Sequence, residues 1–290
     1  MSSGSGKEEE ESTEEEQSTE EEEQSTEEED SSDEEENNTE AESSDTDERM
    51  GFQVPDEDQE EQTSFSGTGR ILQVDYANIC ASNGEPSVGI IAQNGVVIAS
   101  EKKLINSLIE SHSILKMAKL NECLGMVYSG IEADFRQLTR LATKIATGYM
   151  VAEDDTIPLE VLLQELGANI QQYTQSSAVR PFGISLLIAG WRRDRAHLYK
   201  MTCTGCFEPL KAVAIGRNAE AANAYLERQY SEEIVLESAI CLALQTLKLS
   251  CGNNSIGAHQ MAVGISDANG FKILKDFEVG LLLAHLREIP

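Results

Sequence analysis

Few residues of this 290-residue chain have the types and spacing that chemistry requires. Cys203-Thr204-Gly205-Cys206 is a C-x-x-C pair, a spacing found in zinc sites and in redox-active thiols. Zinc needs four ligands, however, and no second cysteine or histidine pair stands at a suitable distance, since the four histidines are isolated from one another. The residues around the pair predict a hairpin turn, whereas a redox thiol is usually activated at a helix N-terminus. We therefore predict two turn cysteines without chemistry, no metal site and no cofactor.

The elements that must position any functional side chain begin with a helix and a hairpin. Residues 69–82 carry apolar side chains at helical spacing, which predicts a short amphipathic helix. Two apolar runs follow, Val88–Ile91 and Val96–Ala99, separated by Asn94-Gly95. Asn-Gly between β-branched runs predicts a hairpin with a type I′ turn, because both residues tolerate positive φ. The runs are apolar on both faces, so we expect strands that are covered on both sides.

The rest of the chain alternates strands with pairs of helices. Strands are expected at 124–128, 183–189, 197–201, 212–215, 261–266 and 271–274, and helices at 135–149, 158–173, 219–230, 236–249 and from about residue 277. Most strands are joined by links of hairpin length, which favours antiparallel sheets. Each helix is apolar along one stripe only, so two stacked sheets with a helix layer outside each would bury every apolar face. The pattern predicts a layered α/β sandwich.

The charge of the chain is concentrated in its first part. The formal net charge is −30, and residues 1–61 hold 29 acidic and two basic side chains, which leaves the remainder close to neutral. Residues 1–62 have almost no apolar side chains to offset the entropy of ordering, so we expect a disordered acidic arm and a globular domain over 63–290. The sequence has no basic patch of the kind that binds nucleic acid. No apolar run is long enough to span a membrane or act as a secretory signal.

The arm also contains possible modification sites. Ser12, Ser18 and Ser25 each have glutamate three residues on, the pattern that acidophilic kinases prefer. Phosphorylation would add about −1.5 to −2 charge at each serine. The arm is thus either a solubilising segment, which we favour, or a regulated interaction tail.

Three stretches resemble a known family. GRILQVDYA (residues 69–77), PSVGI (86–90) and NGVVIASEKK (94–103) are similar to the alpha-type subunits of the twenty-S proteasome, and residues 173–191 are similar to one subtype of them. The resemblance runs from about Thr63 to the C-terminus. It implies an α/β (α+β) fold, the four-layer αββα sandwich of the N-terminal-nucleophile hydrolase type.

The resemblance also implies a subunit without catalytic activity. The related beta-type subunits use an N-terminal threonine, whose free amine serves as base for its own hydroxyl, at the start of the first strand. Here Glu85 leads into that strand, and it has no nucleophilic hydroxyl. Thr68 follows a glycine but lies some twenty residues before the strand. An active threonine peptidase is therefore the second hypothesis, not the first.

The resemblance implies a docking pocket around Lys116. In related subunits a lysine after the EKK segment pairs with the C-terminal carboxylate of activators that end in a hydrophobic–tyrosine–any tripeptide. The matching residue is Lys116, and the matching wall of small residues is Ser129-Gly130. A lone lysine is more often a solvated surface residue, but the aligned context favours the pocket.

The resemblance also implies residues that order a gate. Asp75-Tyr76 matches an acidic–tyrosine pair that helps order the gate, with Asp where Glu is usual. Gly67 stands where related subunits have a proline in a reverse turn that activators move, so the turn is expected to be floppier. The segment that seals the gate has only a loose counterpart in residues 48–52.

The predicted function follows from these residues. We expect a non-catalytic alpha-ring subunit of the proteasome core that contributes to ring assembly, gating of substrate access and activator docking in ubiquitin-dependent degradation. The expected partners are other alpha subunits in a hetero-heptameric ring, beta subunits, and the regulatory particle or other activators. We expect the chain in the cytoplasm and nucleus. A third hypothesis is an acidic-arm binding protein that does not join rings.

Overall fold

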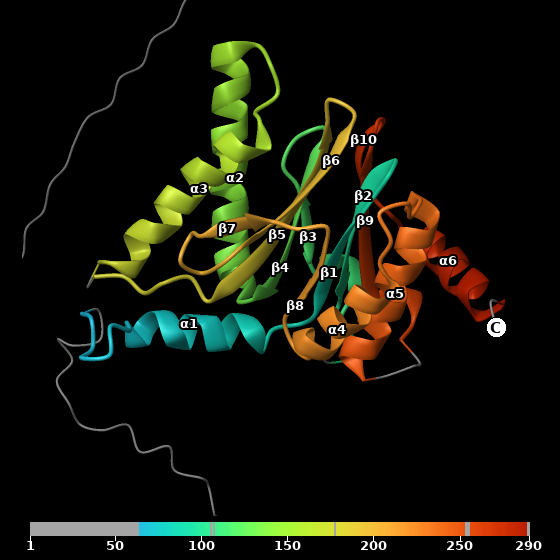
Figure 1. Cartoon of the computed structure of the whole chain (residues 1–290), viewed down its shortest axis with the longest axis horizontal. Coiled ribbons are helices and arrows are strands. Elements are labelled where there is room, and N and C mark those ends of the chain that lie inside the picture. The colour runs from blue at the N-terminus through green and yellow to red at the C-terminus, as the bar shows by residue number, and fades with distance from the viewer. Residues whose placement is uncertain (1–63, 105, 107, 177, 253–255, 289–290) are drawn as a thin grey trace, which may run out of the picture. The chain divides into compact units, whose positions relative to one another are not determined.

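The structure is a computed structural model that describes residues 64–104, 106, 108–176, 178–252 and 256–288, without the side chains of the last four (Figure 1). All of these residues belong to one compact unit, Pro55–Pro290. The predicted acidic arm, with Ser12, Ser18 and Ser25, lies outside the described residues, as does the segment 48–52.

The described strands form two five-stranded sheets in which every neighbouring pair is antiparallel. The first sheet has the order β10 (Gly270–Ile273), β9 (Met261–Asp267), β2 (Gly95–Glu101), β1 (Ser87–Ala92), β8 (Ala212–Ile215). The second has the order β3 (Met117–Lys119), β4 (Leu124–Gly130), β5 (Ile184–Arg192), β6 (Arg195–Met201), β7 (Phe207–Pro209). The sequence analysis missed β3 and β7, which are three residues long and lie at the two edges of the second sheet.

Apart from α1, the helices form a layer outside each sheet, as Figure 1 shows. They are α1 (Leu72–Ser82), α2 (Glu132–Glu153), α3 (Leu159–Thr174), α4 (Ala219–Gln229), α5 (Leu236–Cys251) and α6 (Asp276–Glu288). One apolar core joins α2 and α3 to the second sheet, and another joins α4, α5 and α6 to the first. The predicted four-layer αββα sandwich is confirmed. None of the described helices is both long and apolar enough to cross a bilayer.

The central strands are buried on both faces, as their sequence predicted. Along β2, Val97 and Ala99 point into the core under α5, whereas Val96 and Ile98 point into the core between the sheets. The side-chain period of two in a strand therefore divides one continuous apolar run between two cores. This double burial fixes the register of the β1–β2 hairpin, since a slip by one residue would exchange the two faces.

The turn of that hairpin differs from the prediction. Ala92 pairs with Gly95, so the two loop residues are Gln93 and Asn94, and neither Asn94 nor Gly95 has positive φ. The type I′ turn at Asn94-Gly95 is therefore wrong. Asn94 serves another purpose: its Oδ1 accepts a hydrogen bond at 2.8 Å from the backbone N–H of Leu236, the first residue of α5. Gly95 is needed because a Cβ there would lie 2.9 Å from the carbonyl oxygen of Ser266.

Helix α1 lies across one end of the sandwich and contacts β4 and β5 (Figure 1). Its predicted helical state is confirmed. Ala77 and Ala81 are buried against the sheet, while Leu72, Tyr76 and Ile79 are 44%, 44% and 56% exposed. The small side chains thus allow close packing on the sandwich, and the larger apolar side chains remain on the outer surface of the isolated chain.

Candidate functional site

The predicted site residues lie at the two ends of α1. Lys116, Ser129 and Gly130 are grouped around the segment that follows its C-terminus, whereas Gly67 precedes its N-terminus and Asp75-Tyr76 lies in its first half. The structure therefore groups Lys116, Ser129 and Gly130 at one end of α1, whereas Gly67 and Asp75-Tyr76 lie toward its other end.

Lys116 is buried and has a partner within the chain. Its side chain is 3% exposed, and its Nζ donates to Oε2 of Glu85 at 2.8 Å. The ammonium also lies 4.2 Å from the centroid of the Tyr128 ring, within range of a cation–π interaction. Lys116 stands just before the edge strand β3, and Glu85 just before β1, so the pair joins the two sheets at the end near α1. The alternative of a solvated surface lysine is wrong.

Glu85 is charged in this setting. Burial by itself would raise the pKa of Glu85, but the hydrogen bond and the charge of Lys116 outweigh it, so the pKa lies below its ordinary value. The Glu85 side chain is 25% exposed, far more than that of Lys116. The Glu85 side chain therefore has contact with solvent, whereas that of Lys116 is almost completely shielded from it.

A buried hydroxyl network holds the backbone next to this pair. Ser87 Oγ donates to the carbonyl oxygen of Tyr128 at 2.9 Å and lies 2.8 Å from Ser100 Oγ. Ser100 Oγ in turn lies 3.2 Å from the carbonyl oxygen of Pro86. Both serines are fully buried, so these bonds fix the start of β1 against the end of β4 and give Glu85 a rigid anchor.

Ser129 and Gly130 bring α1 against the second sheet. Ser129 Oγ donates to the carbonyl oxygen of Ala81 at 2.8 Å, which satisfies an acceptor at the C-terminal end of α1. A Cβ on Gly84 would lie 2.2 Å from the backbone nitrogen of Gly130, so the two backbones touch. Gly130 has φ of 120° and lies beside the carbonyl oxygen of Gly183, which a side chain would overlap. Ser129 and Gly130 thus lie against the C-terminal end of α1, with the Ser129 hydroxyl turned toward the helix, and their role as the wall of a docking pocket stays a prediction.

Asp75 connects α1 with the turn that precedes it. Its carboxylate lies 3.0 Å from Nη2 of Arg70, and Tyr76 beside it is partly exposed. The turn is closed by Ser66, whose backbone donates to the carbonyl of Arg70 and accepts from Gly69, both at 2.8 Å. Gly67 is exposed, and a Cβ there would meet no atom within 4 Å. The expected looseness of this turn stays a prediction.

Thr68 is not placed as a nucleophile. It is exposed, its Oγ1 lies 2.8 Å from Ser66 Oγ, and the whole of α1 separates it from the start of β1. Glu85 occupies the position immediately before Pro86 and Ser87, where the resemblance would require the threonine.

Cys203 and Cys206 lie in the β6–β7 turn, as predicted. Both are free thiols, and Met201 pairs with Phe207 around them. Burial raises the pKa of the Cys203 thiol to about 11, and its Sγ donates to Oδ1 of Asn78 on α1 at 3.1 Å. A thiol that stays protonated and hydrogen-bonded is suited to packing rather than redox chemistry. Among the described residues there is no group of histidine, cysteine or acidic side chains that could hold a metal ion.

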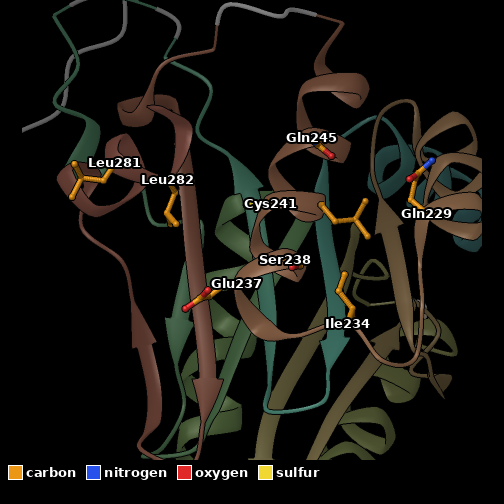
Figure 2. Close-up of a pocket in the computed structure, with 9 residues that line it drawn as sticks. Gln229, Ile234, Glu237, Ser238, Cys241, Gln245, Leu281 and Leu282 are labelled. Atoms are coloured by element: carbon orange, nitrogen blue, oxygen red, sulfur yellow. The ribbon is translucent and has the colours of Figure 1, made fainter. Parts of the chain in front are cut away.

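A separate open cavity of about 600 Å³ lies among α4, α5 and α6. Figure 2 shows Ser238, Cys241 and Gln245 on one wall and Leu281 and Leu282 on the other. Burial, with the nearby charge of Glu237, raises the pKa of the Cys241 thiol, so this thiol is not activated as a nucleophile. It holds none of the predicted site residues.

Sequence reasoning missed the most important partner in the site. Glu85 was noted only for lacking a hydroxyl, and Tyr128 only as part of a strand. The signal available was a charged residue immediately before a strand buried on both faces, a position where an acid needs a counter-charge.

Comparison with known proteins identifies the family of the chain. The family model described as proteasome subunit matches residues 81–266. The proteasome subunit alpha type-2 of Drosophila melanogaster is 42% identical over 224 residues, which cover 77% of this chain and 95% of that protein. The protein of the same name from Oryza sativa subsp. indica is 41% identical over 219 residues, 75% of this chain and 92% of the relative. Proteasome subunit alpha type-2-A of Arabidopsis thaliana is 37% identical over 225 residues, 77% of this chain and 95% of the relative. Alpha type-2 is also the subtype that residues 173–191 indicated.

Proposed function

The chain belongs to the proteasome subunit family as a non-catalytic alpha-type subunit of the core particle, and we propose that it acts there through assembly, gating and activator docking. The observation that carries this proposal is the outer surface of α1. It presents uncovered apolar side chains along its length, the Asp75–Arg70 pair at one end and the Glu85–Lys116 pair beyond the other.

Assembly is supported by the apolar side chains of α1. Leu72, Tyr76 and Ile79 leave about half of each side chain in solvent, and Phe65 just before the helix is 75% exposed. A contiguous exposed apolar surface on a folded chain is typical of an interaction site. We propose that neighbouring alpha subunits in a hetero-heptameric ring cover this surface and that beta subunits stack beneath the ring.

Docking is supported by Lys116. Lys116 is a buried ammonium whose charge is little screened by water, so it forms a charge-assisted hydrogen bond with a carboxylate that reaches it. We propose that Lys116 takes the C-terminal carboxylate of activators such as the regulatory particle, and that Asp75-Tyr76 and the turn at Gly67 order the gate. This role in degradation would place the chain in the cytoplasm and nucleus.

The two other hypotheses are not favoured. A threonine peptidase needs its nucleophile at the start of β1, where this chain has Glu85. A binding protein that no longer joins rings would have no need to keep 92–95% of the length of alpha type-2 relatives at about 40% identity.

The test is native mass spectrometry of particles purified from the source through a tag on this chain. We expect masses that contain this chain together with other alpha subunits and beta subunits. A control tag on a known beta subunit should recover the same complexes. Recovery of this chain only as a free monomer, with the beta-subunit preparation devoid of it, would overturn the proposal.

A further inference from the structure

The Glu85–Lys116 pair raises a question for any ligand that approaches Lys116. The ammonium is 3% exposed, and its hydrogen bond to a carboxylate is already made within the chain at 2.8 Å. The ammonium also lies 4.2 Å from the centroid of the Tyr128 ring, whose face offers no acceptor for a second strong bond. An incoming carboxylate therefore meets a lysine that already has its counter-ion.

The position of Glu85 allows its carboxylate to move away from the Lys116 ammonium. Its side chain is 25% exposed, so it reaches solvent by rotation about its own bonds, whereas the backbone next to it is held by Ser87 and Ser100. Lys103, which is exposed, is the next positive charge that acts on Glu85. A displaced carboxylate would thus face water and a surface lysine instead of an apolar environment.

We propose that Glu85 is an internal competitor that occupies the carboxylate-binding position of Lys116, so that a docking tail must displace it. The inference rests on the proposed docking function of Lys116. Docking then exchanges one charge-assisted hydrogen bond for another and gains little from the charge itself. Affinity must come from the other residues of the tail, and this subunit binds tails more weakly than one in which the lysine is free.

The test measures binding of a synthetic peptide with a hydrophobic–tyrosine–any C-terminus to particles that contain the full chain. The peptide carries a photo-crosslinker, and the crosslinked fraction of this chain is followed by mass spectrometry, so that pockets of other subunits do not contribute. We expect Glu85→Gln to tighten binding by at least about tenfold, since loss of the competing charge removes one charge-assisted bond from the exchange. The same peptide with an amidated C-terminus should gain nothing from this substitution.

Two further variants make the result specific. The control variant is Asp155→Asn, which removes the charge of a carboxylate that also lies 2.8 Å from its cation, Arg192. Asp155 follows the end of α2 that is remote from α1 in Figure 1, so this variant should leave peptide binding unchanged. Lys116→Ala should weaken binding to the unmodified chain. If Glu85→Gln impairs incorporation into particles, Glu85→Asp keeps the charge but shortens its reach, and it should also tighten binding.

The outcomes separate the two proposals. Weaker binding with Lys116→Ala but an unchanged dissociation constant with Glu85→Gln overturns the competitor role and leaves the docking function intact. Unchanged binding with Lys116→Ala overturns the docking function, and the competitor role with it. Tightening of the amidated peptide by Glu85→Gln would contradict competition for a carboxylate.

Discussion

Arg180 donates two parallel hydrogen bonds to Asp134, with Nη1 at 2.8 Å from Oδ2 and Nη2 at 2.7 Å from Oδ1. Asp134 is 4% exposed in the first turn of α2, and its Oδ2 also accepts from the backbone of Gly183 just before β5. The carboxylate therefore ties a helix of the outer layer to the entrance of the central strand of the second sheet.

The first prediction concerns this pair. Arg180→Ala should lower the free energy of unfolding by about 2 kcal/mol, because it leaves a buried carboxylate with only the Gly183 bond. The matched control is Arg136→Ala, because its side chain is 56% exposed, like the 57% of Arg180, whereas its partner Glu132 is 38% exposed, and there the loss should be clearly smaller. Urea unfolding of the full chain measures both. Equal losses would show that the burial of Asp134 does not determine how much its ion pair contributes to the free energy of unfolding.

The second prediction concerns the cap of α5. Asn94→Ala removes the acceptor for the Leu236 N–H and should cost about 1 kcal/mol of stability, whereas Asn94→Asp should retain most of it. Gly95→Ala should cost about 2 kcal/mol, because its Cβ would press on the Ser266 carbonyl. Thermal unfolding of the variants measures these losses of stability. A Gly95→Ala variant as stable as the unmodified chain would contradict the close approach of β9 to Gly95.

The third prediction concerns assembly. Replacing Tyr76 and Ile79 together by Asp should leave a folded chain that fails to join rings, since both side chains are exposed on the isolated chain and the change adds charge to an apolar surface. Circular dichroism checks the fold and native gel electrophoresis checks assembly. The control pair Tyr76→Phe with Ile79→Val keeps the surface apolar and should assemble. Full assembly of the aspartate variant would remove α1 from the interface.

The fourth prediction concerns the pH dependence of the Glu85–Lys116 pair. The folded pKa of Glu85 is lowered below its ordinary value of 4.5, so the pair stabilises the fold above that pH and the contribution is lost as the pH falls through the folded pKa. The difference in unfolding free energy between the unmodified chain and Glu85→Gln should therefore be constant from pH 7 to about 5.5 and shrink below 4.5. A difference that grew on acidification would contradict a charged Glu85.

The fifth prediction concerns the two turn cysteines. Cys206 is exposed, whereas Cys203 is fully buried with a pKa of about 11. At pH 8, iodoacetamide should modify Cys206 in the folded chain and reach Cys203 only after denaturation. Peptide mass spectrometry reads out each site separately. Similar rates at both thiols would mean that the β6–β7 turn opens in solution.

Local sequence patterns predicted much of the fold because most elements are long and strongly periodic. The apolar stripes of residues 135–149 and 158–173 predicted α2 and α3, and the strand expected at 212–215 matches β8. The edge strands β3 and β7 were not predicted, because three residues are too few to show an alternation of apolar and polar side chains.

The errors have a common cause in contacts between distant parts of the chain. Asn94-Gly95 satisfies the local rule for a turn, yet Asn94 is fixed by α5 and Gly95 by β9. Lys116 was located through its resemblance to a family residue, but Glu85 stands 31 positions earlier, and the two meet only when the sheets stack. No local pattern in the sequence indicates a contact between residues so far apart in the chain.

The order of strands in the two sheets has a consequence for synthesis. The second sheet is built from one continuous stretch, β3 to β7, whereas β1 and β2 find their neighbours β8 and β9 only after that stretch is complete. At translation rates of about 5–20 residues per second, the hairpin that ends at Glu101 waits on the order of ten seconds for β9, which begins at Met261. During that interval its outer backbone edges are unpaired, as in strands that are prone to aggregate. A nascent chain at this stage therefore carries exposed hairpin edges that β8 and β9 cover in the finished sheet.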